Sequence, residues 1–541
     1  MCSGICTKLK EKLKAFKSLK GKSCSNSVIP FSFLNNCIGV LAFPLRVMFN
    51  SFVSEGSLPK SFNQALVTPI YKRKGSKKDP SNYRPVSNLP ALSKILEKAI
   101  YSKLYPFIES KNILNNEQHG FRRGRSCFSA ASLFAHNVLA GIDRRKMRCL
   151  AVFVDLKKAF DSICPFKLMV KLFKLGIDPR ILKYLCAYFI GRTFKIKLGD
   201  FISQLFLLLK GCPQGSILSP LLFALFYNDV GSSLLFALFK LFADDLVFYI
   251  FHLDCSKLIE EAEKILASLH QWCTDQDLVI NFAKTEYVIF HKSQDKIAEN
   301  VPELKCNGEI IQRVFCFKYL GVYFDSNFSF QQQFEHVLSK ISSSVGCLIQ
   351  IKRFINLQTF KILVNSFIYS HIDYCLPVWC NISQTHIKTL QSRINTLLAS
   401  YFYPHLHNKF QRLNKIARAS DIPEVKRISF DYNELYEKCN LLSVNERITY
   451  FNAVIAFKAI YSRRIPEISD IFRFGNSLRT QLLIYPEHES KMFENSAYYQ
   501  AIRTWNSLSK VAKEPNISLD KFKSLVDKWL VDERDSDFVS C

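Results

Sequence analysis

Apolar and polar residues follow two different periods along this chain. Residues 258–273 carry apolar side chains at eight positions on one helical face, which predicts an amphipathic helix. The apolar run 150–154 predicts a buried strand, and so do the apolar residues on both sides of Asp244 and Asp245. The sequence therefore predicts a mixture of strands and helices.

The order of these elements predicts an α+β fold. A strand ends at Asp155, a helix after Pro165 ends at Gly176, and the Asp pair forms the tip of a hairpin. The 258–273 helix follows, then short strands around LVINF and YVIF. This is the split βαβ pattern of a ferredoxin-like domain, which brings the end of the 150s strand beside the 240s hairpin.

The flanking regions have a different character. Residues 56–126 are rich in Gly, Pro, Asn and basic side chains, which predicts short strands and loops around one helix at 91–110. Residues 331–400 have helical periodicity with a polar, basic outer face. Helices are expected from about 401 to the end, the last of them with Ser518 as its N-cap.

Charge narrows the class of partner. The 541 residues include 73 Lys plus Arg and 46 Asp plus Glu, a formal net charge of +27, while 48% are hydrophobic. The hydrophobic content excludes a mainly disordered chain. The basic excess favours a polyanion, with nucleic acid as the first candidate, an anionic membrane as the second, and a merely soluble basic protein as the alternative.

Cysteine usage and hydropathy define the setting. The 18 cysteines lie among apolar neighbours without zinc-type spacing, which indicates buried thiols in a reducing, intracellular compartment. Residues 1–22 lack the apolar core of a secretory signal. The most apolar region, 217–251, is interrupted by charged residues, so no membrane partner is expected.

The paired aspartates are the main candidate for chemistry. Solvated turn aspartates are the alternative, but the predicted sheet would place Asp155 opposite Asp244, with Asp245 at the turn. Three carboxylates together repel one another unless cations lie among them, and oxygen-only ligands suit Mg²⁺. Two such ions can support an in-line displacement at phosphorus.

Eight collinear segments resemble one protein family. They are PIYKRKG, NYRPVSNLPALSKILEK, EQHGFRRGRS, FVDLKKAFDSI, GCPQGSILSPLLF, FADD, INFAKTEYVIF and FKYLGVYFD. Their order and spacing are similar to those in the reverse transcriptase of non-LTR (LINE-type) retrotransposons, most of all the jockey-like group. The resemblance runs from about residue 25 to 400, and YCLPVWC and RTWNSLS also resemble the family's C-terminal region.

The resemblance implies a right-hand polymerase with fingers, a ferredoxin-like palm and a helical thumb. It further implies that Asp155 and Asp244 bind two Mg²⁺, or Mn²⁺, with Asp245 assisting. Lys284 matches a lysine proposed to protonate pyrophosphate; the alternative is a solvated strand-end lysine. Phe160 matches the aromatic residue that rejects a 2′-hydroxyl; the alternative is a core phenylalanine.

The remaining matched residues imply contacts with substrates. Gln214 and Gly215 match the nucleotide-pocket motif; the alternative is a plain Pro-Gly turn. The residues expected at the triphosphate are Lys72, Arg84 and Lys94; the alternative is that they are solvated loop charges. The residues expected along the template or at the primer end are Phe121, Arg122, Arg123, Arg125, Tyr319, Leu320 and Gly321.

These observations together predict an RNA-directed DNA polymerase. Its expected partners are an RNA template, a DNA primer, dNTPs and the element's ribonucleoprotein, with no obligate protein partner, acting in the cytoplasm and nucleus. About fifty residues precede SLPKSFNQALVTPIYK, so a truncated element without its endonuclease is expected. The alternative function is a catalytically silent relic that only binds nucleic acid.

The expected divisions of the chain are four: a basic extension with the start of the fingers (1–50), fingers and palm (51–325), thumb (326–400) and a helical C-terminal region (401–541).

Overall fold

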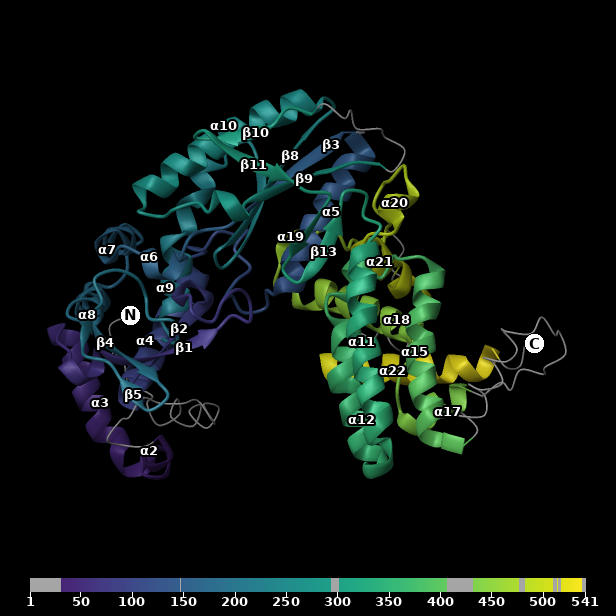
Figure 1. The fold of residues 1–541 in the computed structure, drawn as a ribbon, viewed down its shortest axis with the longest axis horizontal. Coiled ribbons are helices and arrows are strands. Elements are labelled where there is room, and N and C mark those ends of the chain that lie inside the picture. Colours follow the sequence, from purple (N-terminus) through teal and green to yellow (C-terminus); the bar gives the residue numbers. More distant parts are fainter. Residues whose placement is uncertain are drawn as a thin grey trace.

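The computed structural model describes residues 31–145, 147–292, 301–405, 432–475, 482–508, 513 and 517–537. In Figure 1 these residues form an arch, with a β-sheet at its crown and two limbs of mainly helical structure. Residues 1–30 of the predicted basic extension and 406–431 of the predicted C-terminal region lie outside the described residues.

The crown is a six-stranded sheet in the order β10-β11-β9-β3-β8-β7. Its strands are β3 (Arg148–Val154), β7 (Leu238–Phe242), β8 (Asp245–His252), β9 (Glu286–Phe290), β10 (Leu304–Cys306) and β11 (Glu309–Arg313). Strand β3 pairs antiparallel with β8 and with β9, and β7 pairs antiparallel with β8. The order β9-β3-β8-β7 is that of a ferredoxin-like sheet, as the sequence predicts.

Strand β3 is apolar from Cys149 to Val154, as expected where helices cover both faces of a sheet. Leu150, Val152 and Val154 belong to the same hydrophobic core as α10 (Cys255–Asp275). Ala151 and Phe153 face a second core with α5 (Cys127–Arg145). All eight apolar positions predicted on the 258–273 helix are buried in α10, which confirms its amphipathic face.

The first limb carries the N-terminal elements. A second sheet has the order β2-β1-β4-β5, with β6 also paired to β4. Its strands are β1 (Gln64–Tyr71), β2 (Tyr83–Asn88), β4 (Thr193–Leu198), β5 (Phe201–Ile202) and β6 (Phe206–Leu207). The helices of this limb are α2 (Phe31–Asn36), α3 (Ile38–Glu55), α4 (Ala91–Ser110), α6 (Ala159–Ser162), α7 (Pro165–Lys174), α8 (Pro179–Phe189) and α9 (Ser219–Phe226). Helix α4 spans the predicted range, and Gly176 follows α7 with φ +72°, as predicted.

Helix α3 was not expected from hydropathy. By length and composition it is the one helix among the described residues that is apolar enough to cross a membrane, and 17% of it is buried in the molecule. Its buried residues Leu45, Phe49 and Val53 pack into the core of the first limb. Core helices of soluble proteins pass the same test, so this observation is weak support for a membrane span.

The second limb is helical, apart from the hairpin of β12 (Cys316–Tyr319) and β13 (Val322–Asp325). Its helices are α11 (Gln331–Ile351), α12 (Leu357–Val364), α13 (Ser370–Asp373), α14 (Leu376–Trp379), α15 (Gln384–Phe402), α17 (Tyr432–Cys439), α18 (Val444–Phe457), α19 (Pro466–Ser469), α20 (Lys491–Glu494), α21 (Ala497–Ser507) and α22 (Leu519–Asp537). The predicted N-cap of the last helix is present, because Ser518 Oγ accepts the N–H of Lys521 at 3.2 Å.

One predicted strand is wrong. LVINF forms a single bridge, between Leu156 and Ile280, and then turns into a short 3-10 helix, η5 (Phe282–Lys284). Leu278 and Ile280 are buried although they form no ladder. Their apolar alternation supplies core side chains, while the backbone of Asn281 bonds to Asp155 instead of to a neighbouring strand.

Candidate active site

Three carboxylates lie where β3 and β8 end side by side. Val154 pairs with Leu246, so Asp155 directly follows the paired part of β3 while Asp245 begins β8. Asp244 and Ala243 form the two-residue turn between β7 and β8, because Phe242 pairs with Asp245. Ala243 adopts φ +59°, as the first residue of a tight hairpin turn requires. The structure thus brings together the two segments that the sequence predicts to meet.

The three carboxylates interact electrostatically. Burial raises the pKa of Asp244, the charge of Asp155 raises it further, and Arg84 opposes both effects. Burial, Asp244 and Asp155 together raise the pKa of Asp245 to about 6. A cation among these oxygens would relieve the repulsion, and an all-oxygen donor set suits Mg²⁺. As the side chains stand, no three His, Cys, Asp or Glu residues in the described part of the chain enclose a metal position.

Asp155 is held by two residues that the sequence analysis missed. Asn281 donates from Nδ2 to Asp155 Oδ2 at 2.7 Å, and its N–H donates to the Asp155 carbonyl at 2.8 Å. Thr285 Oγ1 accepts the N–H of Asp155 at 3.3 Å. Lys284 lies between these two residues, exposed, with its N–H donating to the Asn281 carbonyl. Lys284 thus belongs to the segment that supports Asp155.

The turn that carries Asp244 is supported from the side by residues 117–120. Gln118 Oε1 accepts the N–H groups of both Gly120 and Ala243. A Cβ on Gly120 would lie 2.2 Å from the Ala243 nitrogen, so only glycine permits this approach. Lys240 and Glu117 form an ion pair behind the turn. The QHG segment is therefore a buttress for the hairpin.

Phe160 lies on α6, five residues after Asp155. Its ring stacks on Phe223 with centroids 4.4 Å apart, and Phe121 meets it edge-on at 6.2 Å. Phe160 is half-buried, so part of the ring is open to solvent. The structure therefore places Phe121 and Phe160, predicted for different contacts, against one another.

Gln214 and Gly215 are fixed against β2. The carbonyl of Gln214 accepts the N–H of Ser87 at 2.7 Å, and Gln214 Nε2 donates to Asp161 at 3.1 Å. Gly215 has φ +130°, and a Cβ there would lie 2.4 Å from the Ser87 carbonyl oxygen. A side chain at 215 would therefore push the two segments apart.

Three predicted phosphate-binding cations lie on the first limb. Arg84 is exposed on β2, and its charge opposes the raised pKa of Asp244. Lys72 is exposed, donates from Nζ to the Ser81 carbonyl at 2.9 Å, and its charge opposes the raised pKa of Asp161. Lys94 lies on the first turn of α4, half-buried. Arg84 therefore interacts electrostatically with Asp244, and Lys72 with Asp161.

Comparison with known proteins identifies this part of the chain. Residues 74–324 match the family model described as reverse transcriptase (RNA-dependent DNA polymerase). These residues form a reverse transcriptase domain. They include the aspartates, Phe160, Gln214 and the buttress.

Three curated relatives are RNA-directed DNA polymerases of mobile elements from Drosophila melanogaster. The probable RNA-directed DNA polymerase from transposon BS is 28% identical over 53% of this chain and 32% of that protein. The one from transposon X-element is 24% identical over 73% of this chain and 44% of that protein. The RNA-directed DNA polymerase from mobile element jockey is 26% identical over 60% of this chain and 38% of that protein. The chain thus spans less than half the length of these relatives, and the jockey-like resemblance is confirmed.

Among solved structures, telomerase from Candida tropicalis in complex with the TWJ fragment of telomeric RNA is 12% identical. It covers 81% of this chain and 67% of that chain, with a TM-score of 0.35. A likeness this weak supports no conclusion.

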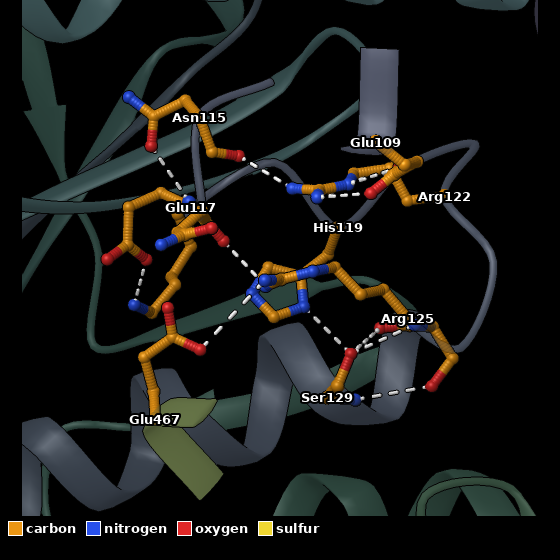
Figure 2. Close-up of polar contacts among 11 residues, drawn as sticks. Glu109, Asn115, Glu117, His119, Arg122, Arg125, Ser129 and Glu467 are labelled. Atoms are coloured by element: carbon orange, nitrogen blue, oxygen red, sulfur yellow. Dashed lines mark hydrogen bonds and ion pairs between the residues drawn. The ribbon is translucent and has the colours of Figure 1, made fainter. Parts of the chain in front are cut away.

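Two of the arginines predicted along a template are engaged within the reverse transcriptase domain and the adjoining region (Figure 2). Arg122 forms a double hydrogen bond with Glu109, and its side chain is 8% exposed. Arg125 lies 3.9 Å from Glu467 of α19 and is 4% exposed. Phe121 and Arg123 are exposed, and they remain the members of this loop that can contact a nucleic-acid strand.

The predicted primer-end residues have unequal exposure. Tyr319 is 3% exposed and packs on Phe134, with ring centroids 5.5 Å apart. Leu320 and Gly321, at φ +46° and +86°, form the turn of the β12–β13 hairpin, and the Leu320 carbonyl accepts the Tyr374 hydroxyl. The turn is thus half-buried against Tyr374, whereas the Tyr319 ring belongs to the core.

A buried carboxylate below the nucleotide motif was also missed. Glu97 of α4 is fully buried, and its Oε2 accepts the Ser216 hydroxyl and the Ile217 N–H, each at 2.7 Å. Arg192 is buried nearby, with its guanidinium 4.1 Å from the Tyr188 ring. Burial raises the pKa of Glu97, and Arg192 opposes this shift. Glu97 therefore fixes the two residues that follow Gly215.

Proposed function

We propose that this chain is the RNA-directed DNA polymerase of a non-LTR retrotransposon, extending a primer 3′-hydroxyl with dNTPs on an RNA template. The observation that carries the proposal is the meeting of Asp155 with Asp244 and Asp245 at adjacent strand ends of a reverse transcriptase domain. In this proposal the crown sheet is the palm, the first limb the fingers, and α11 to α15 the thumb.

Two Mg²⁺ ions are the proposed cofactors. Asp155 and Asp244 would hold them, and Asp245 would assist; when bound, the ions supply charge neutralisation and Lewis acidity at the reacting phosphate. The protein's contribution is to fix these carboxylates on paired strands and through Asn281. Because the pKa of Asp245 is about 6, this carboxylate is ionised for cation binding above that pH.

Residues around the aspartates suit a deoxynucleoside triphosphate. Phe160 offers a partly open ring, stacked on Phe223, that would pack under the sugar. Arg84 places positive charge near Asp244, and Lys72 places it near Asp161, as a triphosphate requires. Lys284 is the proposed proton donor to the departing pyrophosphate.

The alternative is a silent relic that binds nucleic acid through its net positive charge without polymerising. Primer extension on poly(rA) with oligo(dT) separates the two functions, since a relic binds this duplex and adds no dTMP.

The decisive variant is Asp244→Asn, which keeps the side chain's size and removes its charge. We expect it to abolish primer extension while leaving the Kd for RNA within about twofold, because one carboxylate contributes little to binding a polyanion. Asp229→Asn, which changes an exposed carboxylate paired with Lys171, is the matched control. Wild-type extension by Asp244→Asn would remove the metal assignment.

A further inference from the structure

A cavity of about 410 Å³ lies where the C-terminal region meets the reverse transcriptase domain. One wall comes from Gly124, Ser126 and the first turn of α5. The opposite wall comes from α18, α19 and the helical turn η8 (Lys458–Ser462) between them. None of the residues placed at the candidate active site lines this cavity, so it is a separate feature.

The cavity wall is mainly apolar. Serine residues also line it: Ser126 just before α5, Ser129 on α5, and Ser462 and Ser469 opposite. The apolar lining residues are Phe128, Ile455, Ala459, Ile465, Ile468 and Leu519. The volume falls within the range of small-ligand pockets, and a flat apolar ring suits such walls.

Both charged residues that line the cavity in the described part of the chain are cations, Lys458 and Arg464. The nearby carboxylate of Glu467 pairs with Arg125 instead. Burial lowers the pKa of Lys458, and Lys523 lowers it further. The groups that shift the pKa of Lys458 thus include no carboxylate that would balance its charge.

Gly124 allows Arg464 to lie against the loop of the reverse transcriptase domain. It has φ +81°, and a Cβ at this position would lie 2.7 Å from Cδ of Arg464. The same loop carries the exposed Phe121 and Arg123. The cavity therefore continues the surface on which a nucleic-acid strand is expected.

We propose that this cavity binds one nucleotide of a single-stranded nucleic acid, with its base against the apolar wall and its phosphate at Lys458 and Arg464. Aromatic and apolar surfaces beside cations are the usual means of binding single strands without sequence preference. The C-terminal helices would then contribute directly to nucleic-acid binding, and this role does not depend on polymerase activity.

Fluorescence anisotropy with labelled rU and dT 12-mers, without Mg²⁺, tests the proposal on the full chain. We expect Arg464→Glu to weaken binding roughly tenfold and to reduce the salt slope by about 1, as the loss of one phosphate contact does. Phe128→Ala should weaken binding roughly fivefold and leave the salt slope unchanged. Ser462→Glu, at the exposed edge, should act like Arg464→Glu without disturbing the core.

Arg503→Glu is the matched control, because Arg503 is an exposed cation on α21 that does not line the cavity. A larger loss for rU than for dT identifies RNA as the ligand, and the reverse identifies DNA. If Arg464→Glu and Ser462→Glu weaken binding no more than Arg503→Glu, and Phe128→Ala has no effect, the proposal is overturned, whatever the outcome of primer-extension assays.

Discussion

The buried carboxylate of Glu97 offers a sharp test of how the first limb shapes the nucleotide pocket. Replacing it by glutamine preserves shape and one oxygen acceptor, and removes the charge that both the Ser216 hydroxyl and the Ile217 N–H address. Hydrogen bonds to a charged acceptor contribute about 1.5–3 kcal/mol each and neutral ones about 0.5–1.5 kcal/mol.

The two bonds together therefore lose about 2–3 kcal/mol of stability in Glu97→Gln. Arg192 also loses its buried counter-charge, which acts in the same direction. Because Ser216 and Ile217 directly follow Gly215, the loss should release the nucleotide motif. Misplacement of about 1 Å is enough to cost roughly 100-fold in rate.

Steady-state primer extension measures the consequence. We expect kcat/KM for dNTP to fall roughly 10- to 100-fold, mostly through KM, while the KM for primer–template stays unchanged. Hydrogen exchange should increase in residues 211–219 and 83–90, a readout that does not need catalysis.

Asp143→Asn is the matched control. Asp143 is another buried carboxylate, which accepts the N–H of Glu489 on the far side of the sheet from α4. It should lower stability and leave the dNTP KM unchanged. If Glu97→Gln only reduces the active fraction, as Asp143→Asn does, with equal KM and equal exchange in 211–219, the positioning role is refuted.

Three further predictions follow from the site. Gly215→Ala should reduce dNTP incorporation more than roughly 100-fold, because its Cβ would lie 2.4 Å from the Ser87 carbonyl oxygen. The control Gly199→Ala, at φ +60° in open space, should lower stability by only about 1 kcal/mol and leave activity unchanged. Equal activities of the two variants would contradict the packing argument. Asp245→Asn should remove the fall in Mg²⁺ affinity as pH drops through about 6, measured by calorimetry. A raised carboxyl pKa makes the metal-free fold less stable as pH rises from 4 to 6, so this variant should also raise the metal-free Tm at pH 7.5 and not at pH 4; an identical pH profile for both proteins would contradict the assignment. Phe160→Ala should raise the rNTP/dNTP incorporation ratio, and an unchanged ratio would exclude Phe160 as the sugar gate.

Much of the fold follows from local pattern. Periodicity predicts the apolar face of 258–273, the helix at 91–110 and the strands that flank the Asp pair. The structure contains all of them. The pairing of Asp155 with the Asp244 hairpin follows from element order, since few sheet topologies satisfy a split βαβ sequence. LVINF is the exception, because it forms a single bridge instead of a strand, although Leu278 and Ile280 are buried.

Tertiary structure alone decided which polar groups serve which purpose. Nothing in the local sequence distinguishes Arg122 and Arg125, which are engaged with Glu109 and Glu467, from the exposed Arg123. The bonds from Asn281 to Asp155 and from Ser216 to Glu97 join residues 126 and 119 positions apart. Periodicity reports how one segment meets a core, because burial repeats with the helix or strand. A hydrogen bond depends on where a distant donor comes to lie, and the chain sets that only when it folds.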